Sequence, residues 1–183
     1  MRKRIFVILA LSLVGVIVLS GIGVGAYFIR YPLLYKDEIT EAAERFDLPP
    51  ELIASVIRAE SRFFRYAWGS SGEVGLMQLM PSTAAWLAIK MGSPGLEKKL
   101  NIPRVNITFG VFYLRMLYDR FGDVQTVLIA YNAGPTKAAR WLKDPEHATF
   151  DGERYVLRSS PYPSTNAYVD RILNARRHYR WRF

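Results

Sequence analysis

The chain has 183 residues, half of them apolar, which is enough for one globular domain with a short attachment. It contains no cysteine, which excludes disulfides, thiol catalysis and cysteine-ligated metals. Its formal net charge is +9, and its two histidines, His147 and His178, stand in unrelated contexts that give poor support to a histidine metal site or a Ser-His-Asp triad.

The N-terminus has the pattern of a membrane anchor. Residues 1–4 form a basic cap, and residues 5–29 carry no charged side chain before Arg30. As a helix, residues 5–29 would extend roughly 37 Å, enough to cross the hydrocarbon core of a bilayer. The apolar region of a signal peptide is usually only about 7–15 residues long, which favours an uncleaved anchor. Late cleavage near the small residues of 21–26 is the alternative.

The charge distribution around this segment predicts its orientation. Positively charged flanks stay in the cytoplasm, so residues 1–4 are placed inside and the chain after Arg30 outside. We therefore expect a single-pass protein of the cytoplasmic membrane. A linker over 30–36 leads to one domain over 37–183, which faces the periplasm or the cell wall.

The domain is predicted to be mainly α-helical, because apolar residues recur at helical spacing and no convincing alternating run appears. Any sheet is therefore expected to be small. Asp123 is predicted to cap a helix at its N-terminus. The predicted helices cover Asp37–Phe46, Glu51–Ser61, Pro81–Met91, Asn106–Phe121 and Val124–Asn132, and the domain is expected to end in a basic C-terminal helix.

Glu60 continues the apolar face of its predicted helix, because it follows Val56 by four residues and Ile57 by three. Burial against apolar side chains raises the pKa of a carboxyl group. A carboxylic acid that is still protonated near neutral pH suits general acid catalysis. The same pattern also fits a helix-end glutamate that turns toward solvent or pairs with Arg58 or Arg62.

The segment Trp68–Gly75 follows this helix and has three glycines and two serines, a composition typical of a loop whose backbone can approach a ligand. Pro81 then fits the first turn of the next helix.

The C-terminus concentrates arginines between aromatic residues, a pattern that can indicate a nucleic-acid surface. The predicted topology argues against nucleic acid, since this segment lies outside the cytoplasm. A solvated basic face is the simpler interpretation, and attraction to anionic lipid or wall polymers is the functional alternative. The arginines are Arg171, Arg176, Arg177, Arg180 and Arg182.

Three blocks of sequence stand out in order along the chain: Glu60–Phe63 (Glu-Ser-x-Phe), Gly72–Pro81 (Gly-x-x-Gly-Leu-Met-Gln-x-Met-Pro) and Ala130–Gly134 (Ala-Tyr-Asn-Ala-Gly). Together they resemble the motifs of the lytic transglycosylases of the soluble type, which have a goose-type-lysozyme-like catalytic domain. The resemblance spans about Leu33 to Tyr179. It implies a helical, lysozyme-like fold with a groove for peptidoglycan glycan strands.

The resemblance also implies a mechanism. Glu60 would protonate the glycosidic oxygen between N-acetylmuramic acid and N-acetylglucosamine. It would then take the proton of the muramic C6 hydroxyl, closing a 1,6-anhydro ring with no cofactor and no metal. Gln78 would offer an amide to the sugar, and Met80 an apolar wall. The candidate substrate-binding residues are Ser61, Ser70, Glu73, Gln78, Met80, Tyr131, Asn132 and Tyr168.

The chain departs from the family pattern at several positions. Arg65 replaces a proline, Gly69 a serine, Glu73 an alanine and Ser164 a glutamate. Glu73 could compensate for the lost carboxylate or act as a base that activates water, which would make the enzyme a lysozyme-like hydrolase. A peptidoglycan-binding scaffold with little or no cleavage is a further alternative.

Overall fold

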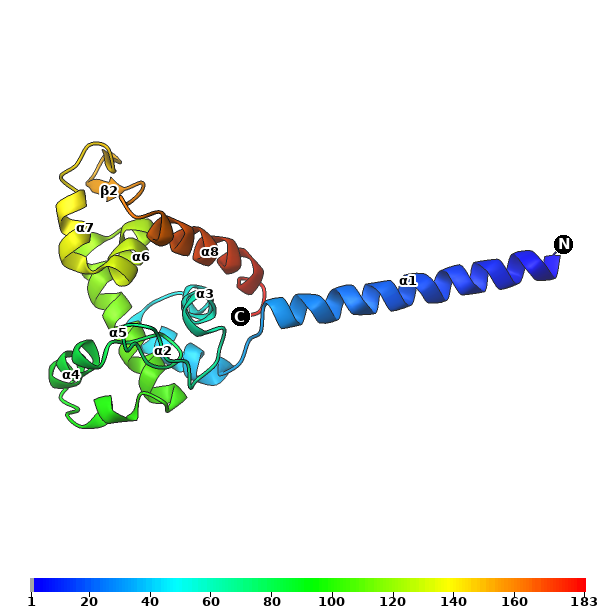
Figure 1. Ribbon diagram of the computed structural model, residues 1–183, viewed down its shortest axis with the longest axis horizontal. Helices are drawn as coiled ribbons and strands as arrows, with labels where there is room; N and C mark the ends of the chain where they lie inside the picture. Colours follow the sequence, from blue (N-terminus) through cyan, green and yellow to red (C-terminus); the bar gives the residue numbers. More distant parts are fainter. Residues whose placement is uncertain (1) are drawn as a thin grey trace. The chain divides into compact units, whose positions relative to one another are not determined.

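The computed structural model describes the backbone of residues 2–183 and the side chains of residues 15, 16 and 18–183. The chain divides into two compact units, Met1–Leu33 and Leu34–Phe183. The first unit is built on one helix, α1 (Arg2–Arg30) (Figure 1). The side chains of residues 5–14 and 17, which belong to the predicted anchor, lie outside the described part. Within the part that is described, no helix combines the length and apolar character needed to cross a bilayer.

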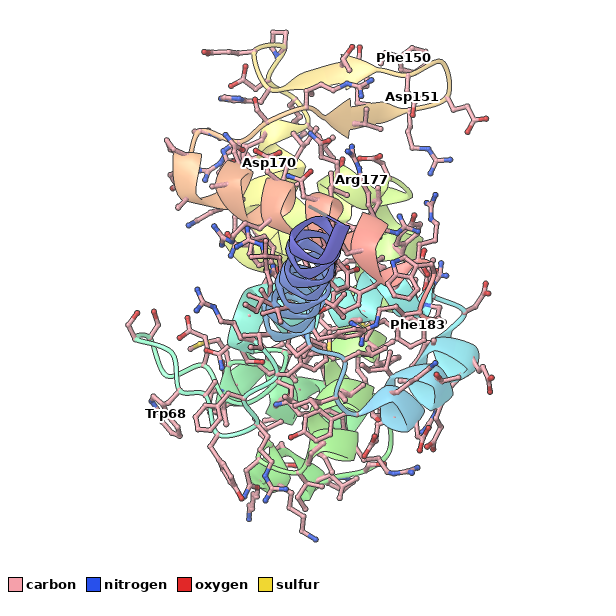
Figure 2. The ribbon with its side chains drawn as sticks, turned by 90° about the vertical axis from the view of Figure 1, so that its right-hand side faces the viewer. Trp68, Phe150, Asp151, Asp170, Arg177 and Phe183 are labelled. Carbon is pink, nitrogen blue, oxygen red and sulfur yellow. The ribbon has the colours of Figure 1, made fainter. Side chains whose placement is uncertain are left out.

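The second unit is mainly helical, as the sequence predicts. The two short strands β1 (Ala148–Phe150) and β2 (Tyr155–Leu157) form an antiparallel hairpin in which Ala148 faces Leu157. Phe150 and Asp151 mark the turn of this hairpin in Figure 2. The helices are α2 (Lys36–Phe46), α3 (Pro50–Ser61), α4 (Pro81–Lys90), α5 (Pro103–Phe121), α6 (Val124–Ala133), α7 (Pro135–Trp141) and α8 (Pro163–Tyr179), with a 3-10 turn, η1 (Leu96–Lys99).

Proline sets the first turn of most of these helices, because its fixed φ angle suits that position and its missing N–H has no helical partner there. The predicted helix from Asn106 therefore begins earlier, at Pro103. The helix α7 was not predicted, since Gly134-Pro135 also has the form of a terminating signal. The predicted cap is confirmed: Oδ2 of Asp123 accepts a hydrogen bond from the backbone N–H of Thr126 at 2.8 Å.

The helix α3 lies at the centre of the unit, with Leu52, Ile53, Val56 and Ile57 almost completely buried. It packs most extensively against α8 and also contacts α2 (Figure 1). A partly buried ion pair joins the first turn of α3 to α8, with Nη2 of Arg176 2.9 Å from Oε1 of Glu51. The predicted apolar stripe is thus the surface on which α8 is held.

One buried side chain, Asn106 of α5, fastens the loop between α3 and α4. Its Oδ1 accepts from the backbone N–H of Met77 at 2.8 Å, and its Nδ2 donates to the carbonyls of Val74 and Leu100, both at 2.9 Å. Gly75 allows this close approach: its φ is +81°, and a Cβ there would lie 2.2 Å from Nδ2 of Asn106. The loop is therefore anchored at its middle.

Replacing Asn106 with Ala should destabilise the protein by about 3 kcal/mol, because it leaves buried backbone groups without partners, each worth roughly 1–3 kcal/mol. Urea unfolding of the purified protein measures the change in the free energy of unfolding. Asn101→Ala, at an exposed position nearby, is the matched control and should change it by less than about 0.5 kcal/mol. Equal stabilities of the two variants would contradict the anchoring role.

Candidate active site

A cavity of about 300 Å³ opens between the end of α3, the loop that follows it and the end of α6. Its wall combines carboxyl, amide and hydroxyl groups with one thioether, a mixture that suits a polar ligand with apolar faces. The lining residues are Glu60, Gly69, Ser70, Glu73, Gln78, Met80, Tyr131 and Asn132. All but Gly69 are among the residues selected from the sequence.

Glu60 occupies the last turn of α3, directly before the helix ends at Ser61. The hydroxyl of Ser61 donates to the carbonyl of Leu76 at 2.8 Å and is 3.1 Å from that of Ile57. Ser61 thus ties the helix end to the loop and does not line the cavity. Arg62 and Phe63 then adopt left-handed φ angles of 52° and 67°, which turns the chain away at once.

The environment of Glu60 raises the pKa of its carboxyl group to about 7. Desolvation by the surrounding side chains is the largest cause, and repulsion by the Glu73 carboxylate acts in the same direction. A hydrogen bond from Tyr168 and the charge of Arg171 oppose the rise in this pKa. Neither Arg58 nor Arg62 is among the causes of this pKa shift. Burial on the apolar face thus describes it better than pairing or exposure.

Tyr168 of α8 is the direct partner of Glu60. Its hydroxyl donates to Oε1 of Glu60 at 2.7 Å, and its side chain is 2% exposed. Burial raises the pKa of the Tyr168 hydroxyl well above its usual value, so it is held as a donor. Tyr168 therefore acts through Glu60 and does not line the cavity, whereas the sequence placed it among the substrate-binding residues.

Gln78 presents an acceptor to the cavity. Its φ is 47°, and its Nε2 donates to the carbonyls of Gly75 at 2.8 Å and Ala67 at 3.2 Å. These bonds occupy its N–H groups within the loop, so Oε1 is the atom left for a ligand. Gln78 thus offers the expected amide group to a ligand, but through its carbonyl oxygen and not through its N–H groups.

Asn132 and Tyr131 of α6 are each oriented by one contact. Oδ1 of Asn132 accepts from the hydroxyl of Thr165 at 2.8 Å, which leaves its Nδ2 as a donor toward the cavity. The hydroxyl of Tyr131 donates to the carbonyl of Met77 at 2.8 Å. Thr165, which the sequence did not single out, thus determines that the nitrogen of the Asn132 amide, and not its oxygen, is presented to a ligand.

Glu73 and Gly69 fit together within the loop. Oε2 of Glu73 accepts from the backbone N–H of Ser71 at 3.0 Å. A Cβ built on Gly69 would lie 2.1 Å from this same oxygen and 2.9 Å from Oε1 of Gln78. The neighbouring Trp68 is 74% exposed and projects from the loop (Figure 2). Only glycine at position 69 leaves room for the carboxylate where it stands.

One group of side chains among the described residues has the spacing of a metal site. Asp144, Glu146 and His147 bring their ligand atoms within 4.8 Å of one another. Oδ1 of Asp144 accepts from the backbone N–H of Glu146, and Nδ1 of His147 lies 3.0 Å from the Ser159 hydroxyl. The group shares no residue with the cavity.

A mainly helical domain with a partly buried carboxylic acid on the wall of a polar cavity is the arrangement expected of a lysozyme-like domain. Comparison with known families is more specific. Residues 37–152 match the family described as "Transglycosylase SLT domain", and the chain belongs to that family.

Individual proteins show the same likeness. The soluble lytic murein transglycosylase of Escherichia coli K12 is 31% identical over 83% of this chain and 24% of its own. A membrane-bound lytic murein transglycosylase C of Edwardsiella ictaluri is 28% identical over 80% of this chain and 46% of its own. The structure of an inactive mutant of the lytic transglycosylase Slt from Pseudomonas aeruginosa matches with a TM-score of 0.74 and 31% identity, over 85% of this chain and 25% of that one. The chain thus spans about a quarter of the length of the soluble relatives.

The raised pKa of Glu60 predicts that stability falls as the pH rises. The folded state favours the protonated carboxyl group, so stability is lost between the ordinary pKa of 4.5 and the folded value of about 7. The loss amounts to about 3 kcal/mol at most. Glu60→Gln should remove this part of the dependence. Urea unfolding at pH 5 and pH 8 measures it, and identical slopes for parent and variant would argue against the burial of Glu60.

Proposed function

We propose that this chain is a peptidoglycan lytic transglycosylase that cleaves the bond between N-acetylmuramic acid and N-acetylglucosamine and leaves 1,6-anhydro ends. The observation that carries the proposal is Glu60, a carboxylic acid with a pKa of about 7 on the wall of a cavity of about 300 Å³. Membership of the SLT family and the names of its lytic transglycosylase relatives support this reaction class.

In the first step Glu60 donates its proton to the glycosidic oxygen as the bond to the anomeric carbon breaks. A pKa near 7 means that the acid is substantially protonated at neutral pH and still a competent donor. Tyr168 holds Oε1 of Glu60, which leaves Oε2 for the substrate. The same hydrogen bond stabilises the carboxylate that forms once the proton has left.

In the second step the positive charge at the anomeric carbon is relieved from within the substrate. The carbonyl oxygen of the acetamido group shares the charge, and the C6 hydroxyl then attacks the anomeric carbon. Its proton passes to the Glu60 carboxylate, which restores the acid for the next cycle. No water is consumed, and the bond formed replaces the bond broken.

The other cavity residues have groups that suit sugar binding. Nδ2 of Asn132 is a donor, Oε1 of Gln78 is an acceptor, and Met80 offers an apolar surface that is 37% exposed. Ser70 adds a hydroxyl on the exposed part of the loop. We propose that these four residues orient the glycan strand across Glu60.

Products released from purified peptidoglycan test this proposal. The parent protein should release muropeptides with anhydro-muramyl ends, which are lighter by one water than reducing ends in mass spectrometry. Glu60→Gln should slow the release by about a thousandfold or more, because it removes the acid and base together. Glu153→Gln, an exposed residue of the hairpin turn, should behave as the parent does.

Two results would contradict the proposal. Reducing ends in place of anhydro ends would mean a hydrolase in which water attacks the anomeric carbon. Binding to peptidoglycan with no release by the parent would mean a scaffold.

We further propose that residues 5–29 anchor the protein in the cytoplasmic membrane, with the catalytic domain on the outer side. The support is the uncharged sequence, its basic flank at residues 1–4 and the helical backbone of Arg2–Arg30. A membrane-bound lytic transglycosylase occurs among the relatives.

Fractionation tests the anchor. The full-length protein should stay with the membrane after alkaline carbonate extraction and dissolve only in detergent, whereas a variant without residues 1–33 should be extracted. A mature chain that begins near Ala26 or later would show that the segment is a cleaved signal.

A further inference from the structure

Glu73 is the cavity residue whose role the proposed mechanism leaves unassigned. It lines the same cavity as Glu60 and is the only other carboxylate among the lining residues. Its Oε2 accepts from the Ser71 backbone, and the described structure gives its Oε1 no hydrogen-bond partner. A carboxylate oxygen is therefore available at the cavity in which the glycosidic bond would break.

The place of this carboxylate depends on Gly69. The φ angle of Gly69 is not in the left-handed region, so its backbone does not require glycine. Its backbone also bonds as that of any residue could, with its N–H donating to the carbonyl of Glu73 at 2.8 Å. What glycine supplies is space: a Cβ would lie 2.1 Å from Oε2 of Glu73. The two residues act as a pair, one providing the charge and the other the room for it.

A negative charge at the cavity wall would assist cleavage of the glycosidic bond. When Glu60 gives up its proton and the glycosidic bond breaks, positive charge develops on the sugar ring. A fixed carboxylate on the cavity wall stabilises that charge without forming a bond. The same carboxylate repels the ionised form of Glu60 and so favours the protonated form of Glu60 before the reaction.

We propose that Glu73, seated in the space left by Gly69, is a second functional carboxylate that stabilises the sugar cation while Glu60 transfers its proton. This inference rests on the proposed function, because it concerns the same bond cleavage. It assigns a purpose to two positions at which the sequence departs from the family pattern.

Glu73→Gln is the primary test, since it removes the charge and keeps an oxygen that can still accept from Ser71. It should lower kcat on peptidoglycan by about tenfold or more with little change in KM, because the lost interaction exists mainly in the transition state. Glu97→Gln is the matched control. Oε2 of Glu97 accepts from the backbone N–H of Gly95 at 2.7 Å, the same local bond, but Glu97 does not line the cavity.

A second readout does not depend on turnover. The charged and titratable groups around Glu60 are Glu73 on the loop, Tyr168 and Arg171 on α8, and Tyr131 on α6. Of these, only Glu73 is changed in the test. Glu73→Gln should therefore lower the pKa of Glu60 in a carbon-13 NMR titration and move the alkaline limb of the pH–rate profile to lower pH. A Glu73 carboxylate that is screened from Glu60 would leave both unchanged and would argue against a charge acting at the reacting bond.

Gly69→Ala tests the pairing of the two residues. The added methyl meets the far end of a flexible side chain, so it should displace the Glu73 carboxylate without unfolding the loop. Its effect on kcat should match that of Glu73→Gln and should disappear in a Glu73→Ala background, where the space is free. An effect that persists in that background would assign it to the nearby Gln78 and would overturn the pairing.

The outcomes separate this inference from the proposed function. A parent that releases anhydro products through Glu60, beside a Glu73→Gln variant of equal kcat and equal Glu60 pKa, would overturn the inference alone. An unchanged total rate with fewer reducing ends in that variant would overturn it in favour of a base that activates water. A parent that releases nothing would overturn both.

Discussion

The site depends on one interaction, the hydrogen bond by which Tyr168 of α8 meets the Glu60 carboxyl group at the end of α3. A second contact joins the opposite ends of the same two helices, between Arg176 and Glu51. Together they make α3 and α8 antiparallel neighbours across an apolar face. This packing takes Glu60 out of water and raises its pKa, while the Tyr168 hydrogen bond and, to a smaller extent, the charge of Arg171 limit the rise in the pKa to about 7. An acid that changes protonation state near neutral pH is the result of these opposing effects.

The loop after α3 is the second rigid part of the site. Many of its backbone groups bond to one another, and three side chains add further bonds: Asn106 from α5, Ser61 from α3 and Gln78 within the loop. A loop held in this way can present Ser70, Glu73 and the Gln78 carbonyl in fixed directions before a ligand arrives. Because the loop is already ordered, ligand binding carries little further entropic cost for ordering it.

Function and stability are in opposition here. A buried carboxyl group reduces the free energy of unfolding at pH values where the unfolded chain would ionise it, and a second carboxylate in the same cavity adds repulsion. The fold tolerates this because the apolar contacts of Leu52, Ile53, Val56 and Ile57 hold α3 in place independently of its last turn. Burial that shifts a pKa at some cost in stability is common where a group must react.

The sequence by itself predicted most of the helices and the importance of the Glu51–Ser61 segment, and it placed Glu60 in line with the apolar face of its helix while leaving a turn toward solvent open. These properties are local, since helical periodicity, a first-turn proline and an N-cap aspartate act within a few residues of one another. It also indicated the family, whose motifs carry Gln78, Tyr131 and Asn132. It did not determine which atoms those side chains present.

Only the tertiary structure determined which side chains of the site contact one another. Tyr168 and Glu60 are 108 residues apart, and no periodicity links a residue of one helix to the end of another. The loop bonds that occupy Nε2 of Gln78, and the space that Gly69 leaves for Glu73, depend on backbone coordinates that the order of residues does not reveal. Local interactions select the elements, but the chemistry of this site arises where distant elements pack, because packing sets burial, and burial sets the protonation of Glu60.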